Sequence, residues 1–160
     1  MVRRGILGGV LLALLLLAPG AAAAEPGERE AYVERAEPVC KTNVLANQRI
    51  FKGTEGEVKR GQLQKASGDF KRAARAFGKT IRQLDAIPKP PADAARLSKW
   101  IGLLRDEKDL IKKIGLALAA ENKRKAESFS VDLNRNSSKA NNAVLPFGFN
   151  YCRIEPSRFR

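Results

Sequence analysis

Apolar residues recur at steps of three and four through most of the chain, which is the period of an amphipathic α-helix. The first such stretch runs to about Phe51 and places Tyr32 and Val44 on one face. Pro38 lies inside this stretch. Because proline removes a backbone donor and clashes with the preceding turn, we expect either a kink there or a helix that begins near Glu37.

The second stretch is the most regular amphipathic run in the chain. It follows Gly53, Gly56 and Gly61, which lie in a segment of mixed charge that we interpret as a connection. The steps of three and four continue from Leu63 to Leu84 and predict one long helix. Its apolar face consists of Leu63, Ala66, Phe70, Ala73, Phe77, Ile81 and Leu84.

Two further helical stretches follow the proline-rich residues 88–91, which end the second helix and suit the first turn of the next. The apolar stripe of the third stretch is Leu97, Trp100, Ile101, Leu104, Ile111, Ile114 and Leu118, and that of the fourth is Ala126, Phe129, Leu133, Ala140 and Val144. No segment alternates with the period of two that is typical of a strand. Four amphipathic helices with short connections predict an all-α fold, an antiparallel four-helix bundle that needs no cofactor.

The N-terminus has the order of a secretory signal peptide. A cationic start precedes an apolar run from Ile6 to Leu17, and small residues follow before Glu25. A membrane-spanning helix needs about 20 apolar residues, so the shorter run favours a cleaved signal peptide over a retained anchor, which stays the alternative. We expect residues 1–24 to be the signal peptide and residues 25–160 to form one exported domain.

The chain contains two cysteines, Cys40 and Cys152. In an exported protein a disulfide is the default state, and two cysteines allow one pairing. Two free thiols are the alternative, although no histidine is present to activate either of them. We expect the disulfide to hold Phe147, Phe149 and Tyr151 against the bundle.

The composition excludes several kinds of site. Without a histidine, the chain cannot form a Ser-His-Asp triad or a His-containing zinc site, and two cysteines cannot form a four-thiolate metal site. No phosphate loop or dinucleotide fingerprint is present either. Carboxylates cluster at Asp106, Glu107 and Asp109, which we place on the solvent side of the third helix in salt bridges with Arg105 and Lys108. We therefore expect a protein that is not an enzyme and holds no metal.

The charge balance is strongly basic. Thirty Lys and Arg residues against 17 Asp and Glu residues give a formal net charge of +13. A stripe of cations on the second helix lies opposite its apolar face and predicts binding to an anionic cell-envelope polymer or a membrane surface. A generic basic exterior is the alternative, and sequence-specific nucleic-acid binding is not expected. The candidate polyanion-binding residues are Lys65, Lys71, Arg72, Arg75, Lys79 and Arg82.

Polar side chains on inward faces offer a different function. Asn43 and Asn47 share a face of the first helix, and Asn134 and Asn141 share a face of the fourth. We favour hydrogen bonds between such residues across the bundle, which would fix its register. The alternative is that they line a cavity for a small ligand, so a carrier stands beside the secreted binding or structural module that we expect. The complete set is Asn43, Asn47, Asn134, Asn136, Ser137, Asn141 and Asn142.

Four segments of the chain carry a resemblance to a family. They are Glu37–Lys41, Asn47–Gly53, Pro90–Trp100 and Ala140–Cys152. These segments resemble small secreted helical proteins predicted from actinobacterial genomes, an uncharacterised family, and the likeness covers nearly all of the chain after the signal peptide. The resemblance implies export, a helical fold and a cysteine pair, and it assigns no catalytic residue.

Overall fold

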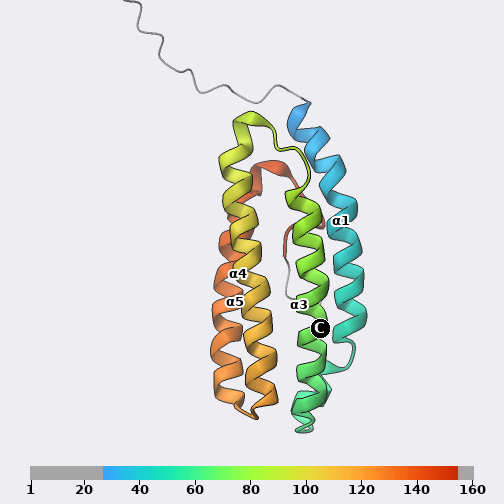
Figure 1. Ribbon diagram of the computed structural model, residues 1–160, viewed down its shortest axis with the longest axis vertical. Helices are drawn as coiled ribbons and strands as arrows, with labels where there is room; N and C mark the ends of the chain where they lie inside the picture. The colour runs from blue at the N-terminus through green and yellow to red at the C-terminus, as the bar shows by residue number, and fades with distance from the viewer. Residues whose placement is uncertain (1–26, 155–160) are drawn as a thin grey trace, which may run out of the picture.

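The computed structural model describes residues 27–154, and in these residues it contains helices and no strand (Figure 1). Four long helices pack together: α1 (Glu28–Phe51), α3 (Leu63–Asp85), α4 (Ala94–Ala119) and α5 (Lys123–Ala143). The shorter elements are α2 (Thr54–Lys59) and two 3-10 helices, η1 (Pro91–Asp93) and η2 (Leu145–Phe147). The predicted all-α class and the four-helix bundle are confirmed. The predicted signal peptide, residues 1–24, lies outside the described residues.

Helix α1 continues through Pro38 without interruption. The alternative of a helix that begins near Glu37 is wrong, because the turns before the proline are held by packing. Tyr32 is fully buried in the core, and Arg29 pairs with Asp93 at 2.8 Å. These contacts with the rest of the bundle outweigh the hydrogen bond that the proline removes.

The connection expected between the first two long helices contains a helix of its own, α2. Its one apolar residue, Val58, packs against the core, and its buried contacts are otherwise polar. The Thr54 hydroxyl donates to Asp69 at 2.5 Å, and buried Glu57 pairs with Lys65 at 2.8 Å. Because no apolar stripe marks this helix, the hydrophobic period could not predict it.

Helices α3, α4 and α5 form the most closely packed part of the bundle. At Gly115, a Cβ atom would lie 2.9 Å from the Cβ of Phe70 and 3.3 Å from the carbonyl oxygen of Ser67. The glycine therefore allows α4 to approach α3 at this level. Helix α1 packs mainly on α3 and has few contacts with α5, so the bundle is less tightly closed on that side.

Residues 148–154, the C-terminal segment, join α1 to the rest of the bundle. Cys152 forms the predicted disulfide with Cys40, with the two Cα atoms 5.0 Å apart. Phe147 and Phe149 are buried in the core next to the disulfide, as expected from the sequence, and their rings stack with centroids 5.5 Å apart.

Polar contacts fix the same segment at both of its sides. On α1, the Glu37 carboxylate accepts a hydrogen bond from the Tyr151 amide at 3.0 Å. On α5, the Asn141 carboxamide accepts from the Ile154 amide at 2.7 Å and donates to the Ile154 carbonyl oxygen at 2.8 Å. The C-terminal segment therefore bridges α1 and α5 where these helices have little direct contact.

Two hydrophobic clusters make up the core. The larger one combines residues of α1, α3 and α4 with residues between Ala140, near the end of α5, and Cys152. The smaller one combines residues of α3, α4 and α5. The first includes Tyr32, Leu84, Leu97, Trp100 and Phe149; the second includes Leu63, Ala66, Ile114, Leu118 and Ala126. Among residues 27–154, no helix combines the length and the apolarity that crossing a membrane requires.

Candidate functional site

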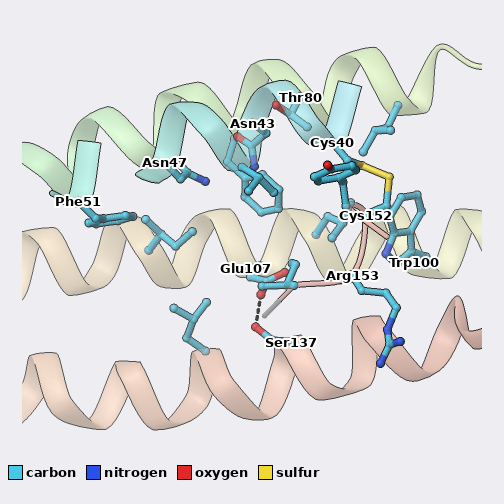
Figure 2. A pocket seen from close by; sticks show the side chains of 18 of the residues that line it. Cys40, Asn43, Asn47, Phe51, Thr80, Trp100, Glu107, Ser137, Cys152 and Arg153 are labelled. Atoms are coloured by element: carbon cyan, nitrogen blue, oxygen red, sulfur yellow. Dashed lines mark hydrogen bonds between the residues drawn. A yellow bond between two sulfur atoms is a disulfide. The ribbon is translucent and has the colours of Figure 1, made fainter. Parts of the chain in front are cut away.

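A cavity of about 120 Å³ lies inside the bundle, with residues of both hydrophobic clusters and of the C-terminal segment in its wall. In Figure 2 its lining extends from Phe51 near the end of α1 to Trp100 and the disulfide of Cys152. Asn134 also lines the cavity and is solvent-exposed, so the space reaches the surface at α5. We call this space the interhelical cavity. A cavity of about 150 Å³ holds a benzene molecule. The interhelical cavity is somewhat smaller but reaches the surface, so a single ring is the upper limit of what it encloses.

The wall of the interhelical cavity is mostly apolar and strongly aromatic. Phe51 and Phe70 meet edge to face at one end, with ring centroids 5.0 Å apart. Trp100 forms part of the other end, where it stacks on Phe149 at 5.6 Å. The remaining apolar lining residues are Val44, Phe77, Leu84, Leu104, Ile111, Leu133 and Ile154. Such a wall suits the apolar body of a ligand.

Glu107 is the acidic residue of this wall. It is 1% exposed, and the Ser137 hydroxyl on α5 donates a hydrogen bond to its Oε1 atom (Figure 2). Its Oε2 atom is buried without a partner among the described residues. Burial raises the pKa of the Glu107 carboxyl to about 7, and the hydrogen bond from Ser137 opposes that shift. The carboxyl group can therefore act as a donor or as a charged acceptor near neutral pH.

The expectation that Glu107 lies on the solvent side of α4 is wrong. Position 107 follows Leu104 by three residues and precedes Ile111 by four, which places it on the apolar stripe. The spacing of the apolar stripe predicts that Glu107 is buried, although charged residues stand on both sides of it in the sequence. Asp106 and Asp109 are exposed as expected, and Asp109 pairs with Lys108 at 3.1 Å.

The asparagines do not form the expected hydrogen bonds to one another. Asn136 donates to the Leu103 carbonyl oxygen at 2.8 Å, and Asn141 holds the C-terminal segment. Asn43 and Asn47 line the interhelical cavity instead, and the Oδ1 atom of each is buried without a partner in the described part of the chain. For these two residues the structure therefore agrees with the alternative expectation, that inward asparagines line a cavity.

Five buried polar atoms of the lining residues lack a hydrogen-bond partner among residues 27–154. They are Oδ1 of Asn43, Oδ1 of Asn47, Nε1 of Trp100, Oε2 of Glu107 and Nε of Arg153. Buried polar atoms in folded proteins are nearly always hydrogen-bonded to protein, water or ligand. Because these atoms surround one apolar space, a water molecule or a ligand inside it would find several polar partners there.

The six predicted polyanion-binding residues are all exposed on α3, but the structure divides them. Lys65 pairs with buried Glu57, and Arg72 pairs with buried Asp69. Lys79 is exposed outside the groove described next.

A shallow groove on the outside of α3 and α4 gathers the other three cations. Its volume is about 620 Å³, and sequence reasoning did not single out the two lysines that α4 contributes to it. Those lysines are spaced by four residues, so they share a face of the helix. The charged residues of this basic groove are Lys71, Arg75, Arg82, Lys108, Asp109 and Lys112.

Comparisons with protein-family models, with curated proteins and with solved structures find no match to the chain. The resemblance to secreted actinobacterial proteins therefore stays a prediction. In the described part of the chain, no group of three or more cysteine, aspartate and glutamate side chains is arranged to hold a metal ion.

Proposed function

We propose that this protein binds a small, largely apolar ligand in the interhelical cavity. One observation carries the proposal: an aromatic cavity of about 120 Å³ is surrounded by five buried polar atoms that lack partners among the described residues. Protein interiors are packed about as densely as organic crystals. A buried polar atom left without a partner costs about 1–3 kcal/mol. A ligand that fills the space and bonds to these atoms would offset both penalties.

The residues that line the cavity support a carrier rather than an enzyme. Among residues 27–154, Glu107 is the one carboxylic acid in its lining, and acid-base catalysis without histidine would call for a second such group near it. The C-terminal segment contributes Tyr151, Cys152, Arg153 and Ile154 to the wall. The disulfide thus ties one wall of the binding site to α1.

We further propose that the protein acts outside the cytoplasm as an antiparallel bundle of residues 25–160. The N-terminal sequence has the order of a signal peptide. A disulfide between Cys40 and Cys152 is typical of an oxidising compartment. Both observations support export.

The binding proposal is tested by titration calorimetry with toluene and benzyl alcohol. Leu133 lines the cavity, and Leu103 is similarly half-buried but lies outside the lining. The parent and Leu103→Trp should bind both compounds, whereas Leu133→Trp should bind them at least tenfold more weakly because its indole fills the space. Circular dichroism checks that both variants fold. Equal binding by the two variants, or no binding by the parent, would contradict the proposal.

A second function, binding of an anionic envelope polymer, is favoured by the basic groove. Five cations and one carboxylate line it, and the carboxylate, Asp109, already pairs with Lys108. The remaining positive charge faces solvent on a surface that a flexible polyanion can reach. This site lies on the outside of α3 and α4, so it is compatible with a ligand inside the bundle.

A further inference from the structure

The buried acidic residues differ in one respect. Four acidic side chains are buried in the described part of the chain: Glu57, Asp69, Asp93 and Glu107. Three of them have a cationic partner, since Lys65 pairs with Glu57, Arg72 with Asp69 and Arg29 with Asp93. Glu107 is the most buried of the four, at 1% exposed, and no lysine or arginine among residues 27–154 pairs with it.

Buried charges in proteins are generally paired. Three of the four buried acids follow this rule, and the fourth, Glu107, lies unpaired at the cavity wall. We propose that the ligand is a compact amine whose ammonium group supplies the missing cation and pairs with the Glu107 carboxylate. This inference rests on the proposed function, because it requires a ligand in the interhelical cavity. It adds the chemical class that the cavity selects.

The polar groups around the cavity match an ammonium group. Such a group carries three N–H donors and no acceptor. Glu107 on α4 offers Oε2, and the carboxamide groups of Asn43 and Asn47 on α1 lie across the cavity from it (Figure 2), each with an Oδ1 atom that lacks a partner among the described residues. Ser137 bonds to the other carboxylate oxygen and so steadies the ionised form. A buried ion pair is stable only when its remaining bonding capacity is used, and the two carboxamide groups are the acceptors that α1 provides for this purpose.

The aromatic wall supports the same class of ligand. A cation is attracted to the face of an aromatic ring, most strongly to tryptophan. Trp100 on α4 and Phe77 on α3 both line the cavity, whereas the Tyr151 ring already has the Lys41 ammonium group 5.4 Å from its centroid. The apolar remainder of a small amine would contact Leu104, Ile111 and Leu133, so both parts of the ligand have matching surfaces.

Arg153 is the one cation in the lining, and it leaves Glu107 unpaired. Its side chain is half-buried, and in Figure 2 its guanidinium points away from Glu107. The ionisable groups that line the cavity are thus Glu107 on α4, Tyr151 and Arg153 on the C-terminal segment, and none on α1, α3 or α5. When an ammonium ion binds to protonated Glu107, the carboxyl proton is released to solvent and the carboxylate remains in the ion pair.

The test compares ligands of equal size that differ in charge. Calorimetry at pH 7.5 measures benzylamine, benzyl alcohol and toluene on the parent, Glu107→Gln and Glu127→Gln, a control whose side chain is exposed on α5 and lies outside the lining. We expect the parent and Glu127→Gln to bind benzylamine at least tenfold more tightly than benzyl alcohol. In Glu107→Gln that preference should fall below twofold, with benzyl alcohol still bound. A repeat on the parent at pH 5 should also reduce the preference, which provides a test that needs no variant.

The outcomes separate the two proposals. If benzyl alcohol and toluene bind but benzylamine binds no more tightly, the amine assignment is overturned and the cavity remains a binding site. If none of the three compounds binds, the proposed function itself is overturned, and this inference falls with it. A preference for benzylamine that persists in folded Glu107→Gln would also overturn the assignment.

Discussion

The Glu107 carboxyl on α4 accepts a hydrogen bond through Oε1 from the Ser137 hydroxyl on α5, which leaves Oε2 as its oxygen without a partner. The two oxygens therefore have different roles. One is fixed by the neighbouring helix and orients the carboxyl group. The other is available to a molecule in the interhelical cavity.

Burial of Glu107 predicts that the protein loses stability as the pH rises. The pKa of its carboxyl group is about 7 in the folded protein and 4.5 ordinarily. Between pH 4.5 and pH 7 the folded protein therefore keeps a proton that the unfolded chain has already released, so a rising pH favours unfolding. The free energy of unfolding should fall by about 3 kcal/mol between pH 4.5 and pH 8, with the loss complete above the folded pKa. Urea unfolding of the parent at several pH values measures it, and no histidine titrates in this window.

The matched variants are Glu107→Gln and Glu127→Gln. Glu127 is exposed on α5, so its replacement should leave the pH profile of the parent unchanged. Glu107→Gln keeps the shape of the side chain without a charge, and its stability should be nearly constant from pH 5 to pH 8. A parent protein that is equally stable at pH 5 and pH 8 would show that Glu107 is not held in an apolar environment.

The disulfide is expected to contribute strongly to stability. Cys40 and Cys152 are 112 residues apart in the sequence, and closing a loop of about that length stabilises a fold by roughly 4–5 kcal/mol in the chain-entropy model. The double variant Cys40→Ser/Cys152→Ser should lose about this much free energy of unfolding. Its Trp100 fluorescence should also shift, because Trp100 stacks on Phe149 of the C-terminal segment.

Chemical reduction of the parent is the control for this prediction. The reduced parent should unfold at the same urea concentration as the double variant, since both lack the same bond. A loss below about 1 kcal/mol in both would mean that the hydrogen bonds of Glu37 and Asn141 hold the C-terminal segment without the disulfide.

Close packing of α3 on α4 predicts opposite effects for two glycine substitutions in α4. In Gly115→Ala the new Cβ would lie 2.9 Å from the Cβ of Phe70, and overpacking of this kind costs about 1–3 kcal/mol. A Cβ atom added at Gly102 would have no neighbouring element within 4 Å, so Gly102→Ala should stabilise the helix by about 0.5–1 kcal/mol. Thermal unfolding of both variants measures the difference. A Gly115→Ala variant as stable as the parent would refute the close approach.

Much of the fold could be predicted from the apolar period alone. The second, third and fourth long helices follow regular stripes, and the pair Cys40 and Cys152 allows one disulfide. The short helix α2 could not be predicted, because a single apolar residue, Val58, gives no period and buried polar contacts of Thr54 and Glu57 help to hold the helix. The turns of α1 before Pro38 were missed for a related reason, since distant contacts of Tyr32 and Arg29 support them.

The candidate site could be predicted in part. The inward asparagines were recognised from their spacing, but their lack of mutual hydrogen bonds depends on how far α1 lies from α5. The C-terminal segment bridges these two helices. The cysteine pair predicts its contact with α1, but no local pattern predicts its hydrogen bonds to Asn141 on α5. Glu107 sits on the stripe of α4, so its burial could have been deduced from its register with Leu104 and Ile111.

The basic groove predicts salt-sensitive binding to a polyanion such as inorganic polyphosphate. Replacing Lys71, Arg75 and Arg82 by Gln should weaken binding at least tenfold at low salt and reduce the slope of affinity against salt concentration. Thermal stability should hardly change, because exposed charges contribute little to it. Lys65 and Arg72 are left intact, since each pairs with a buried acid.

The control for the basic groove is a second triple variant with the same change in net charge. It replaces Lys123, Arg124 and Lys139 by Gln, all three of which are exposed on α5. This variant should bind polyphosphate like the parent. If both triple variants weaken binding equally, the effect comes from total charge and the groove is not a site.

The central claim, that the interhelical cavity holds a small ligand, is tested most directly by nuclear Overhauser effects between bound benzyl alcohol and methyl groups. We expect contacts from the ring protons to methyl groups of Leu104, Ile111 and Leu133, which line the cavity. Leu116 and Val131 are exposed and lie outside its lining, so they should show none. Contacts confined to these exposed side chains, or no contacts at all under saturating benzyl alcohol, would contradict it.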